Sequence, residues 1–531
     1  MPGQHWARNF VITNDDLEYL TGLLLERETP LSSDDLARAL IENRVQQEID
    51  ELEARYKGVL PYTPDGSFPV GTKLIFPAMD FEVATVISTR PGNGNIQYGD
   101  FNVIAVAFEN DKLNKQPSRE FASDLKTPHA LSRHDDEGEE ASFLPTDIPS
   151  AEEILTTHRA EILQELDTKL KASPELVRLT GKWFPRALLV ETHIGHINLA
   201  EAVLDLADGV PLSTEEILDQ IGGLENASQE LQVFSLNYAL NNDSRFDEVG
   251  PSGEILWSLT RLEPKDVVHV PPMLSYAEID YDPALLDLSL RALELEICDE
   301  LSDIPDIPMD DPMDEVGVTL IYPHRRMGTF PLNARTRPVF PTARSTPRVW
   351  VTMVDNEDGE EFPCWIVRNA RFVYGLAPYY RKHRLPIGAY VNIFREDDDP
   401  GKVAISYDGH RPRTEWIRLI TSQNNQIAFE NHRRAIGAEY DDLMVLGADD
   451  LAMVDGFFQT AQQQKKPLSS ILKTIIPALG RLTPQGTAHA KTIYSAVNIV
   501  RRCPPGPIFA TLIANPDFQT VGDHYWKLTS D

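Results

Sequence analysis

Apolar residues recur with helical spacing along much of the chain, and three of these stretches precede the same tetrad. The tetrad Pro-Leu-Ser-Ser/Thr occurs at 30–33, 211–214 and 467–470. The preceding helical stretches are Leu17–Leu25, Leu199–Ala207 and Leu451–Gln464. A serine at this place caps the free N–H groups of a following helix, and acidic residues follow it in the first two copies. Each copy therefore predicts a helix, a tight turn and a second helix.

A second repeat predicts a β-hairpin. Residues 246–259 and 518–528 share the pattern F-x-x-V-G, a short variable turn, and then W-x-L. Alternating apolar positions on both sides of a glycine-containing turn are typical of two paired strands. The helical segments Leu231–Leu240 and Ile508–Ala514 precede the two hairpins. Helix, turn, helix, helix and hairpin is the order of a winged helix, in which the apolar residues of the repeat pack on the helices.

The middle copy carries a resemblance to a known family. Asp243-Ser244-Arg245-Phe246 and Trp257-Ser258-Leu259 resemble the end of a HARE-HTH winged helix, over about residues 194–264. This module is found in the bacterial RNA polymerase delta subunit, in restriction systems and in chromatin regulators. The resemblance implies binding to nucleic acid or to a transcription complex, and it implies no catalysis. The last copy lacks the arginine before Phe518, and residues 10–58 match the helix-turn-helix half without a following wing.

Two β-rich segments separate the helical ones. Residues 61–109 contain alternating stretches at 72–76, 82–89 and 103–108, which predict a small SH3-like barrel. Residues 316–446 predict a larger barrel-like domain, for which a DNA-binding pseudobarrel is one option by analogy. Its strand candidates are Val349–Met353, Cys364–Val367, Arg371–Val373, Tyr390–Ile393, Val403–Ser406 and Trp416–Ile420. The predicted fold class is α+β, with winged-helix modules alternating with small β-barrel-like domains.

Charge divides the chain into two halves. The formal net charge is −33, with 61 acidic and 23 basic residues in 1–315 and 21 acidic and 26 basic residues in 316–531. The divide falls in residues 294–315, which hold ten carboxylates, several prolines and no Lys or Arg. We interpret this stretch as a solvated acidic linker. The alternative is an acidic segment that attracts a basic partner. A second acidic linker is predicted at 110–150.

These boundaries give a seven-part organisation. The parts are 1–60, a helix-turn-helix-like module; 61–109, a barrel; 110–150, a linker; 151–293, a HARE-HTH-like winged helix with flanking helices; 294–315, a linker; 316–446, a basic barrel-like domain; and 447–531, a basic winged helix. No apolar run is long enough to cross a membrane, no secretory signal is visible, and the three cysteines are far apart. We expect a cytoplasmic protein that is not attached to a membrane.

Two windows in the second half are candidates for contact with nucleic acid. Residues 316–354 and 456–516 contain no acid, and aromatic residues accompany the arginines that follow the first window. Arginine suits phosphates and guanine edges, and aromatic rings stack on unpaired bases. The predicted contacts are Arg325, Arg326, Arg335, Arg337, Arg344, Arg348, Arg381, Lys382, Arg384, Lys465, Lys466, Lys473, Lys491, Arg501 and Arg502. The alternative is that the aromatics form a core and the cations are solvated or pair with the acidic half.

The charge balance predicts different partners for the winged helices. The acid-free C-terminal copy fits docking on DNA, with a helix in the major groove and the wing on the backbone. The middle copy crowds carboxylates on its first two helices, which would repel phosphate. We therefore predict that the middle copy binds protein.

Enzymatic motifs are not evident in the sequence. It contains no phosphate-binding loop, nucleophile elbow or kinase motif set. His193 and His196 have metal-like spacing, but no third ligand is evident. The acidic run 355–361 is more typical of an exposed turn than of a Mg²⁺ site. His324 and His383 have no identifiable partner, so we expect no catalytic residue, metal or cofactor.

These observations favour a non-enzymatic, nucleic-acid-associated adaptor or transcription regulator. Its C-terminal half would contact DNA, and its acidic N-terminal half would contact a protein such as RNA polymerase. Two alternatives stay open. One is a nuclease or an accessory component of a restriction or defence system. The other is a purely protein-binding scaffold whose basic windows neutralise the acidic half.

Overall fold

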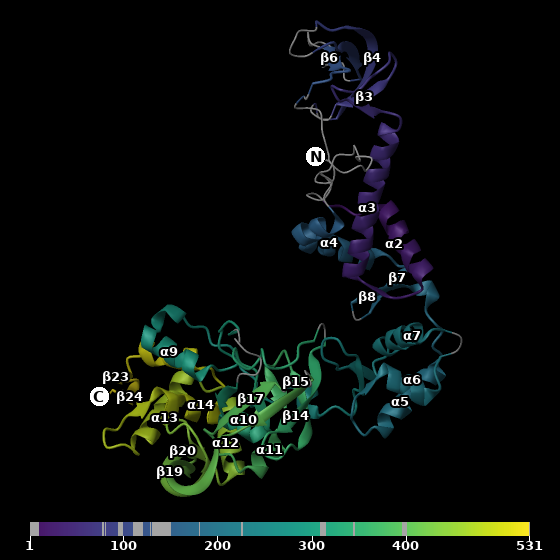
Figure 1. The fold of residues 1–531 in the computed structure, drawn as a ribbon. Helices are drawn as coiled ribbons and strands as arrows, with labels where there is room; N and C mark the ends of the chain where they lie inside the picture. Colours follow the sequence, from purple (N-terminus) through teal and green to yellow (C-terminus); the bar gives the residue numbers. More distant parts are fainter. Residues whose placement is uncertain are drawn as a thin grey trace. The chain divides into compact units, whose positions relative to one another are not determined.

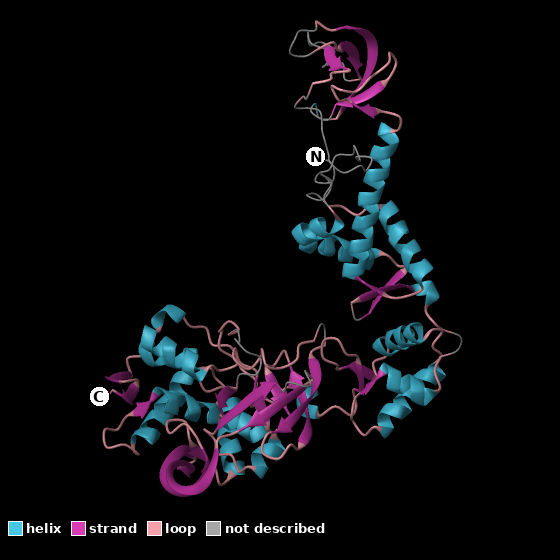
Figure 2. Cartoon of the chain, viewed as in Figure 1, coloured by secondary structure: helices cyan, strands magenta, loops and turns pink. Residues whose placement is uncertain are grey.

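The chain divides into two compact units, Met1–Leu189 and Val190–Asp531. The computed structural model describes residues 10–76, 79, 81–93, 99–109, 120–127, 129, 150–179, 181–224, 227–307, 315–343, 346–395 and 401–529. Both units contain helices and strands, in agreement with the predicted α+β class (Figures 1 and 2). None of the described helices combines the length and the apolar character needed to cross a bilayer.

A winged-helix module forms one part of the first unit. Its elements are α2 (Asn14–Arg27), β1 (Leu31–Ser32), α3 (Ser33–Tyr56), α4 (Ala151–Ala172), β7 (Leu176–Leu179) and β8 (Lys182–Pro185). The strand order is β1-β8-β7. Leu24, Leu40 and Leu166 belong to the core that joins the three helices. The prediction that α4 and the following hairpin belong to a 151–293 domain is corrected, because they supply the third helix and the wing of this first module.

A five-stranded sheet is inserted between α3 and α4. Its strands follow each other in sequence order: β2 (Leu60–Pro61), β3 (Lys73–Phe76), β4 (Glu82–Pro91), β5 (Asn102–Phe108) and β6 (Glu120–Ser123). The Tyr62 hydroxyl donates to the carbonyl of Ala122 at 2.8 Å, and the N–H of Asp124 donates to the carbonyl of Gly66 at 3.0 Å. These bonds bring the two ends of the sheet together, as expected for a small barrel.

The barrel extends past its predicted end at residue 109. β6 lies inside the segment predicted as a linker, because its backbone pairs with β5 and the ring of Phe121 packs against Tyr62 and Phe76. The other residues of that predicted linker lie outside the described part of the chain, apart from 124–127, 129 and 150.

The second unit begins with another winged helix. Its elements are α5 (Ile194–Leu206), β9 (Leu212–Ser213), α6 (Thr214–Ile221), α7 (Gln229–Asn241), β10 (Phe246–Glu248) and β11 (Leu256–Leu259), and a short turn η3 (Arg186–Leu188) precedes it. The hydroxyl of Ser213 accepts from the backbone N–H of Glu216, and the backbone N–H of Ser213 donates to the carboxylate of Glu216. This reciprocal pair is a capping box. The helix start and the hairpin predicted here are therefore confirmed.

The acidic segment after this module is packed against the protein. It follows α8 (Lys265–Val268), η4 (Pro283–Leu285) and α9 (Leu288–Ile297). Cys298, Asp299 and Glu300 are buried, and Asp306 pairs with Arg337 at 2.7 Å. The predicted linker at 294–315 is thus corrected as far as residue 307, because basic partners neutralise the carboxylates that were expected to repel each other. Residues 308–314 lie outside the described chain.

A seven-stranded sheet forms the centre of the second unit. Its strands and short helices are β12 (Val316–Thr319), α10 (Tyr322–Met327), β13 (Thr329–Pro331), β14 (Arg348–Asp355), β15 (Glu361–Val367), β16 (Phe372–Tyr374), α11 (Ala377–Lys382), β17 (Tyr390–Arg395) and β18 (Lys402–Ser406). The order is β12-β17-β18-β14-β15-β16-β13, with β14 and β18 parallel. Five of the six predicted strands coincide with strands of this sheet.

A long hairpin follows the sheet. It consists of β19 (Gly409–Gln423) and β20 (Gln426–Ala438), and the short β21 (Leu446–Gly447) pairs with β19 (Figure 1). Asn424 and Asn425 form its two-residue turn with φ of 52° and 58°, a left-handed conformation that asparagine tolerates. Ile420, Ile427 and Phe429 near the turn join the core of the C-terminal helices.

The C-terminal segment completes a further winged helix. After α12 (Leu451–Gln463) come α13 (Leu468–Gly480), β22 (Ala488–His489), α14 (Ala490–Val500), α15 (Pro505–Ala514), β23 (Phe518–Gly522) and β24 (Tyr525–Leu528). The tetrad at 467–470 opens α13, the first helix of the module. It is therefore not equivalent to the other two tetrads, and Ala488-His489 takes their place before the second helix.

In the described chain, these three modules share one topology and one tryptophan position. In each, the last strand lies between the first strand and the other wing strand. Trp183, Trp257 and Trp526 stand on that last strand, opposite Leu31, Leu212 and Ala488. The modules therefore agree in register as well as in the order of their elements.

The indole N–H of this tryptophan has a partner in two modules. Trp183 donates to Ser33 at 3.0 Å, and Trp257 donates to Thr214 at 3.2 Å and to Asn237 at 2.7 Å. Ala490 occupies the place of Ser33 and Thr214 in the third module, and the indole N–H of Trp526 is buried without a partner among the described residues.

Candidate functional site

The cations predicted to bind nucleic acid do not form one surface. Seven of them pair with carboxylates, and four pairs join the acidic half of the chain to the basic half. These four are Arg337–Asp306, Arg348–Asp247, Lys491–Glu296 and Arg502–Asp299. The other three are Arg326 with Asp455, Lys382 with Asp355, and Lys473 with Asp517. Much of the basic excess thus serves to hold acidic segments in place.

The remaining predicted cations have other surroundings. Arg325, Arg335, Arg381 and Arg501 donate to backbone carbonyl groups. Arg384 and Lys465 are exposed, Lys466 is half-buried, and Arg344 lies outside the described residues. Exposed cations are therefore scattered over α11 and the loop after α12.

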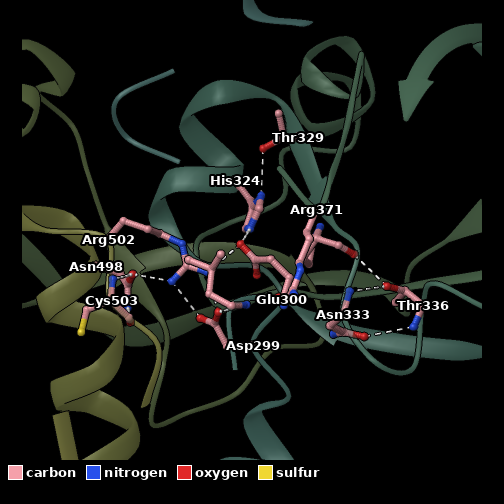
Figure 3. A network of polar contacts seen from close by, with 12 residues as sticks. Asp299, Glu300, His324, Thr329, Asn333, Thr336, Arg371, Asn498, Arg502 and Cys503 are labelled. Carbon is pink, nitrogen blue, oxygen red and sulfur yellow. Dashed lines mark hydrogen bonds and ion pairs between the residues drawn. The ribbon is translucent and has the colours of Figure 1, made fainter. Parts of the chain in front are cut away.

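Arg502 is the centre of a buried polar network (Figure 3). Its guanidinium donates to both carboxylate oxygens of Asp299 at 2.8 and 2.7 Å and to Glu300 at 2.6 Å. His324 bridges Glu300 at 3.0 Å and the hydroxyl of Thr329 at 2.8 Å. Burial alone would raise the pKa of Glu300, but Arg502 and His324 lower it below its usual value. The network fastens the segment after α9 to α10 and to the end of α14.

Burial corrects the predicted roles of two cations. Arg502 has an exposed fraction of 1%, and Lys491 is also buried. Neither side chain lies on a surface that a phosphate could reach. Their positive charge is matched by Asp299, Glu296 and Asp441 within the fold.

The third helices of the winged-helix modules do not carry a basic face. In the C-terminal module seven of the ten residues of α15 are buried, and α9 and η4 pack against this helix. The predicted docking of this helix in a DNA groove is therefore corrected, because other elements already cover it. α7 contains no Lys or Arg, and α4 has five carboxylates against three basic residues.

A polar cluster lies at the end of β14. The ammonium of Lys382 contacts Asp355 at 2.7 Å, Asp358 at 2.6 Å and Glu360 at 2.8 Å. His383 lies at 2.6 Å from Asp355 and at 3.2 Å from the hydroxyl of Tyr407. Burial would raise the pKa of Asp355, whereas Lys382 and His383 lower it below its usual value.

This cluster has the residue types of a metal or acid–base site, but its ligand atoms are already paired within the protein. Asp355, Asp358 and Glu360 offer oxygens within 4.8 Å of one another, as metal ligands do. Lys382 lies among them and supplies the positive charge that a metal ion would bring. Both ring nitrogens of His383 already have partners, so no free nitrogen faces a substrate. The partner of His383 that the sequence did not reveal is Asp355, 28 residues earlier.

A pocket of about 430 Å³ opens beside α8 and α12. Its lining includes Lys265, His269, Met273, Met327, Asp455 and Phe458. Asp455 accepts from the hydroxyl of Tyr322 at 2.7 Å and pairs with Arg326 at 2.7 Å. Of the two carboxylates in the lining, Asp266 and Asp455, Asp455 is thus committed to the protein, and the lining suggests no particular cofactor.

The middle module exposes an apolar stripe that the sequence pattern did not single out. Leu199, Ala202 and Leu206 follow one another on one face of α5, and Val210 comes shortly after the helix. Leu206 is 85% exposed, and Leu199 and Val210 are about half exposed. Around them, residues 190–262 carry 13 carboxylates and two arginines. Arg245 and Arg261, the two arginines, both pair with carboxylates of α5.

No protein-family model, curated protein or solved structure matches the chain.

Proposed function

We propose that the chain is a non-enzymatic adaptor that joins a protein partner to nucleic acid. The apolar stripe of α5 carries this proposal. Exposed leucines on a strongly acidic module suit a partner surface that is apolar at its centre and basic at its rim. The same negative charge disfavours contact between this module and phosphate, so the protein-binding and nucleic-acid-binding roles fall on different parts of the chain.

The resemblance of the middle module to HARE-HTH winged helices favours a transcription complex as the partner. RNA polymerase is therefore the first partner to test. The proposal includes a cytoplasmic location, which suits the three buried free thiols Cys298, Cys364 and Cys503.

The test of the protein contact uses the full chain and purified bacterial RNA polymerase. Leu206→Gln removes the most exposed apolar residue of the stripe and should weaken association at least tenfold. Leu288→Gln is a matched control, because Leu288 is 87% exposed on α9 in the same unit. Equal affinities for the two variants would exclude the stripe as the interface, and no association with the parent chain would exclude this polymerase as the partner.

The nucleic-acid contact is tested by titration of the full chain with DNA at increasing salt. Binding that weakens steeply with salt is expected for contacts between arginine and phosphate. No binding at low ionic strength would remove this half of the proposal.

A protein-binding scaffold without nucleic-acid contact is the second candidate function. The four ion pairs between the acidic and basic halves favour it, because they account for part of the basic excess without a phosphate. Binding of the polymerase together with no binding of DNA would select this candidate.

A further inference from the structure

An exposed tryptophan stands on the hairpin of β19 and β20. Trp416 is 67% exposed, although large aromatic side chains are mostly buried in folded proteins. Arg433 lies directly opposite it on β20, and its guanidinium carbon is 5.8 Å from the centre of an indole ring. The ring therefore presents an aromatic surface, with a cation over one of its faces, to molecules outside the chain.

The alternation of side chains along the strands determines the surroundings of this ring. The neighbours on its face are Thr414, Arg418, Asn431 and Ala435. Thr414 and Ala435 are small, so they leave one side of the ring uncovered. The two carboxylates of the hairpin, Glu415 and Glu430, belong to the opposite face. The face of Trp416 thus combines an open ring with positive charge and carries no carboxylate from the hairpin.

The hairpin as a whole complements a polyanion. Residues 409–438 contain five arginines and two glutamates. Arg434 pairs with Asp449, and Arg418 donates to the carbonyl of Asp442 at 2.7 Å. Arg411, Arg413 and Arg433 are exposed. Arg433 is therefore available for a phosphate beside Trp416, whereas Arg413 belongs by alternation to the opposite face with Glu415.

We propose that this face of the hairpin binds single-stranded nucleic acid. One base stacks on Trp416, and Arg433 holds a neighbouring phosphate. The inference rests on the proposed nucleic-acid contact and specifies its ligand. In a duplex the faces of the bases are covered by their neighbours, so stacking on an exposed ring requires an unpaired base.

The experiment titrates the full chain with a labelled oligothymidylate and with a labelled duplex, at low and at physiological salt. Trp416→Ala should weaken binding of the single strand by about 5- to 150-fold, which is the range for loss of one stacked base. Trp416→Phe should keep most of the affinity, because a smaller ring still stacks. Arg433→Ala should weaken binding and reduce the slope of log affinity against log salt by about 0.7.

Arg38→Ala is the matched control, since it removes the same charge from an exposed position on α3 in the first unit. Its affinity should stay close to that of the parent chain. Binding that is unchanged in Trp416→Ala would overturn the inference while the proposed adaptor function stands. Tighter binding of the duplex would also overturn it. If no variant binds either nucleic acid, the inference and the nucleic-acid half of the proposed function both fail. Loss of polymerase binding in Trp416→Ala, without loss of oligothymidylate binding, would reassign the face to a protein partner.

Discussion

Arg502 and Asp299 face each other in the interior of the second unit, joined by two parallel hydrogen bonds across 203 residues of sequence. Both side chains are fully buried in this ion pair. An acidic segment that looks like a solvated spacer in the sequence is thereby anchored beneath the C-terminal winged helix.

Removal of Arg502 should destabilise the second unit strongly. Arg502→Ala leaves Asp299 and Glu300 buried without their main partner, a loss that costs about 3–5 kcal/mol in comparable buried pairs. The midpoint of thermal or urea unfolding, followed by circular dichroism, measures the effect. Arg381→Ala is the surface control and should stay within about 0.5 kcal/mol of the parent chain. A similar midpoint for both variants would contradict the central role of this network.

Ala490→Ser should stabilise the C-terminal module by about 1 kcal/mol, because it gives the indole N–H of Trp526 a hydroxyl partner. Ser33 and Thr214 supply this partner in the other two modules. The free energy of unfolding of the full chain, compared by urea titration, measures the gain.

The specificity of this gain is checked in a Trp526→Phe background. There the Ala490→Ser substitution should no longer stabilise, because no indole N–H is left to donate. A gain of the same size in both backgrounds would assign the effect to the helix start and not to the tryptophan.

His489 should make the protein less stable in mild acid. Burial, with His524 and Lys491 nearby, lowers the pKa of His489 to about 4 from an ordinary value of 6.5. In the unfolded chain the ring takes up a proton below about pH 6.5, whereas in the fold it does so only near pH 4. The stabilising contribution is therefore present above pH 6.5 and decreases as the pH falls toward 4.

His489→Ser isolates this contribution. Serine retains a cap for α14, as Ser32 and Ser213 do for α3 and α6. The variant should lose less thermal stability than the parent chain on acidification through this range. His432→Ser, at a histidine whose side chain is 42% exposed, should follow the parent chain. Parallel curves for all three proteins would contradict the prediction.

Glu263 should act in the opposite direction. Burial raises the pKa of Glu263 to about 8, Arg348 opposes this increase, and Asp247 adds to it. Since the fold prefers the protonated carboxyl, its contribution is complete below about pH 4.5 and is lost as the pH rises through 8. Glu263→Gln mimics the protonated form and should flatten the alkaline decline of the melting temperature. Glu254→Gln, at an exposed carboxylate, should leave that decline unchanged.

The alternating patterns predicted most strands and the two hairpins that follow F-x-x-V-G…W-x-L. The first wing escaped this pattern because Leu176 replaces the phenylalanine, Leu179 replaces the valine, Pro185 replaces the last leucine and Gly181 comes one residue later, while Trp183 keeps its place. A barrel inserted between α3 and α4 also separated this wing from its helices in the sequence.

The surfaces were harder to predict than the fold. A window without acids indicates how much positive charge is present, but it does not indicate which carboxylate, 100 or more residues away, neutralises it. Arg348 and Asp247 are such a pair. Trp416 was predicted as part of a strand, but alternation indicates only that a strand has two faces and does not show which of them is covered.

The barrel is inserted in the sequence of the first winged helix, so the ribosome synthesises the barrel before the rest of that module. Leu31 leaves the ribosome 152 residues before its strand partner Trp183, a delay of about 8–30 seconds at ordinary elongation rates. During that time α2 and α3 are exposed without the apolar face of α4. The barrel, complete at Ser123, has time to fold first, and its closed ends shorten the loop that β1 and β8 must close. A folded barrel thus shortens the stretch of chain that separates β1 from β8 before they pair.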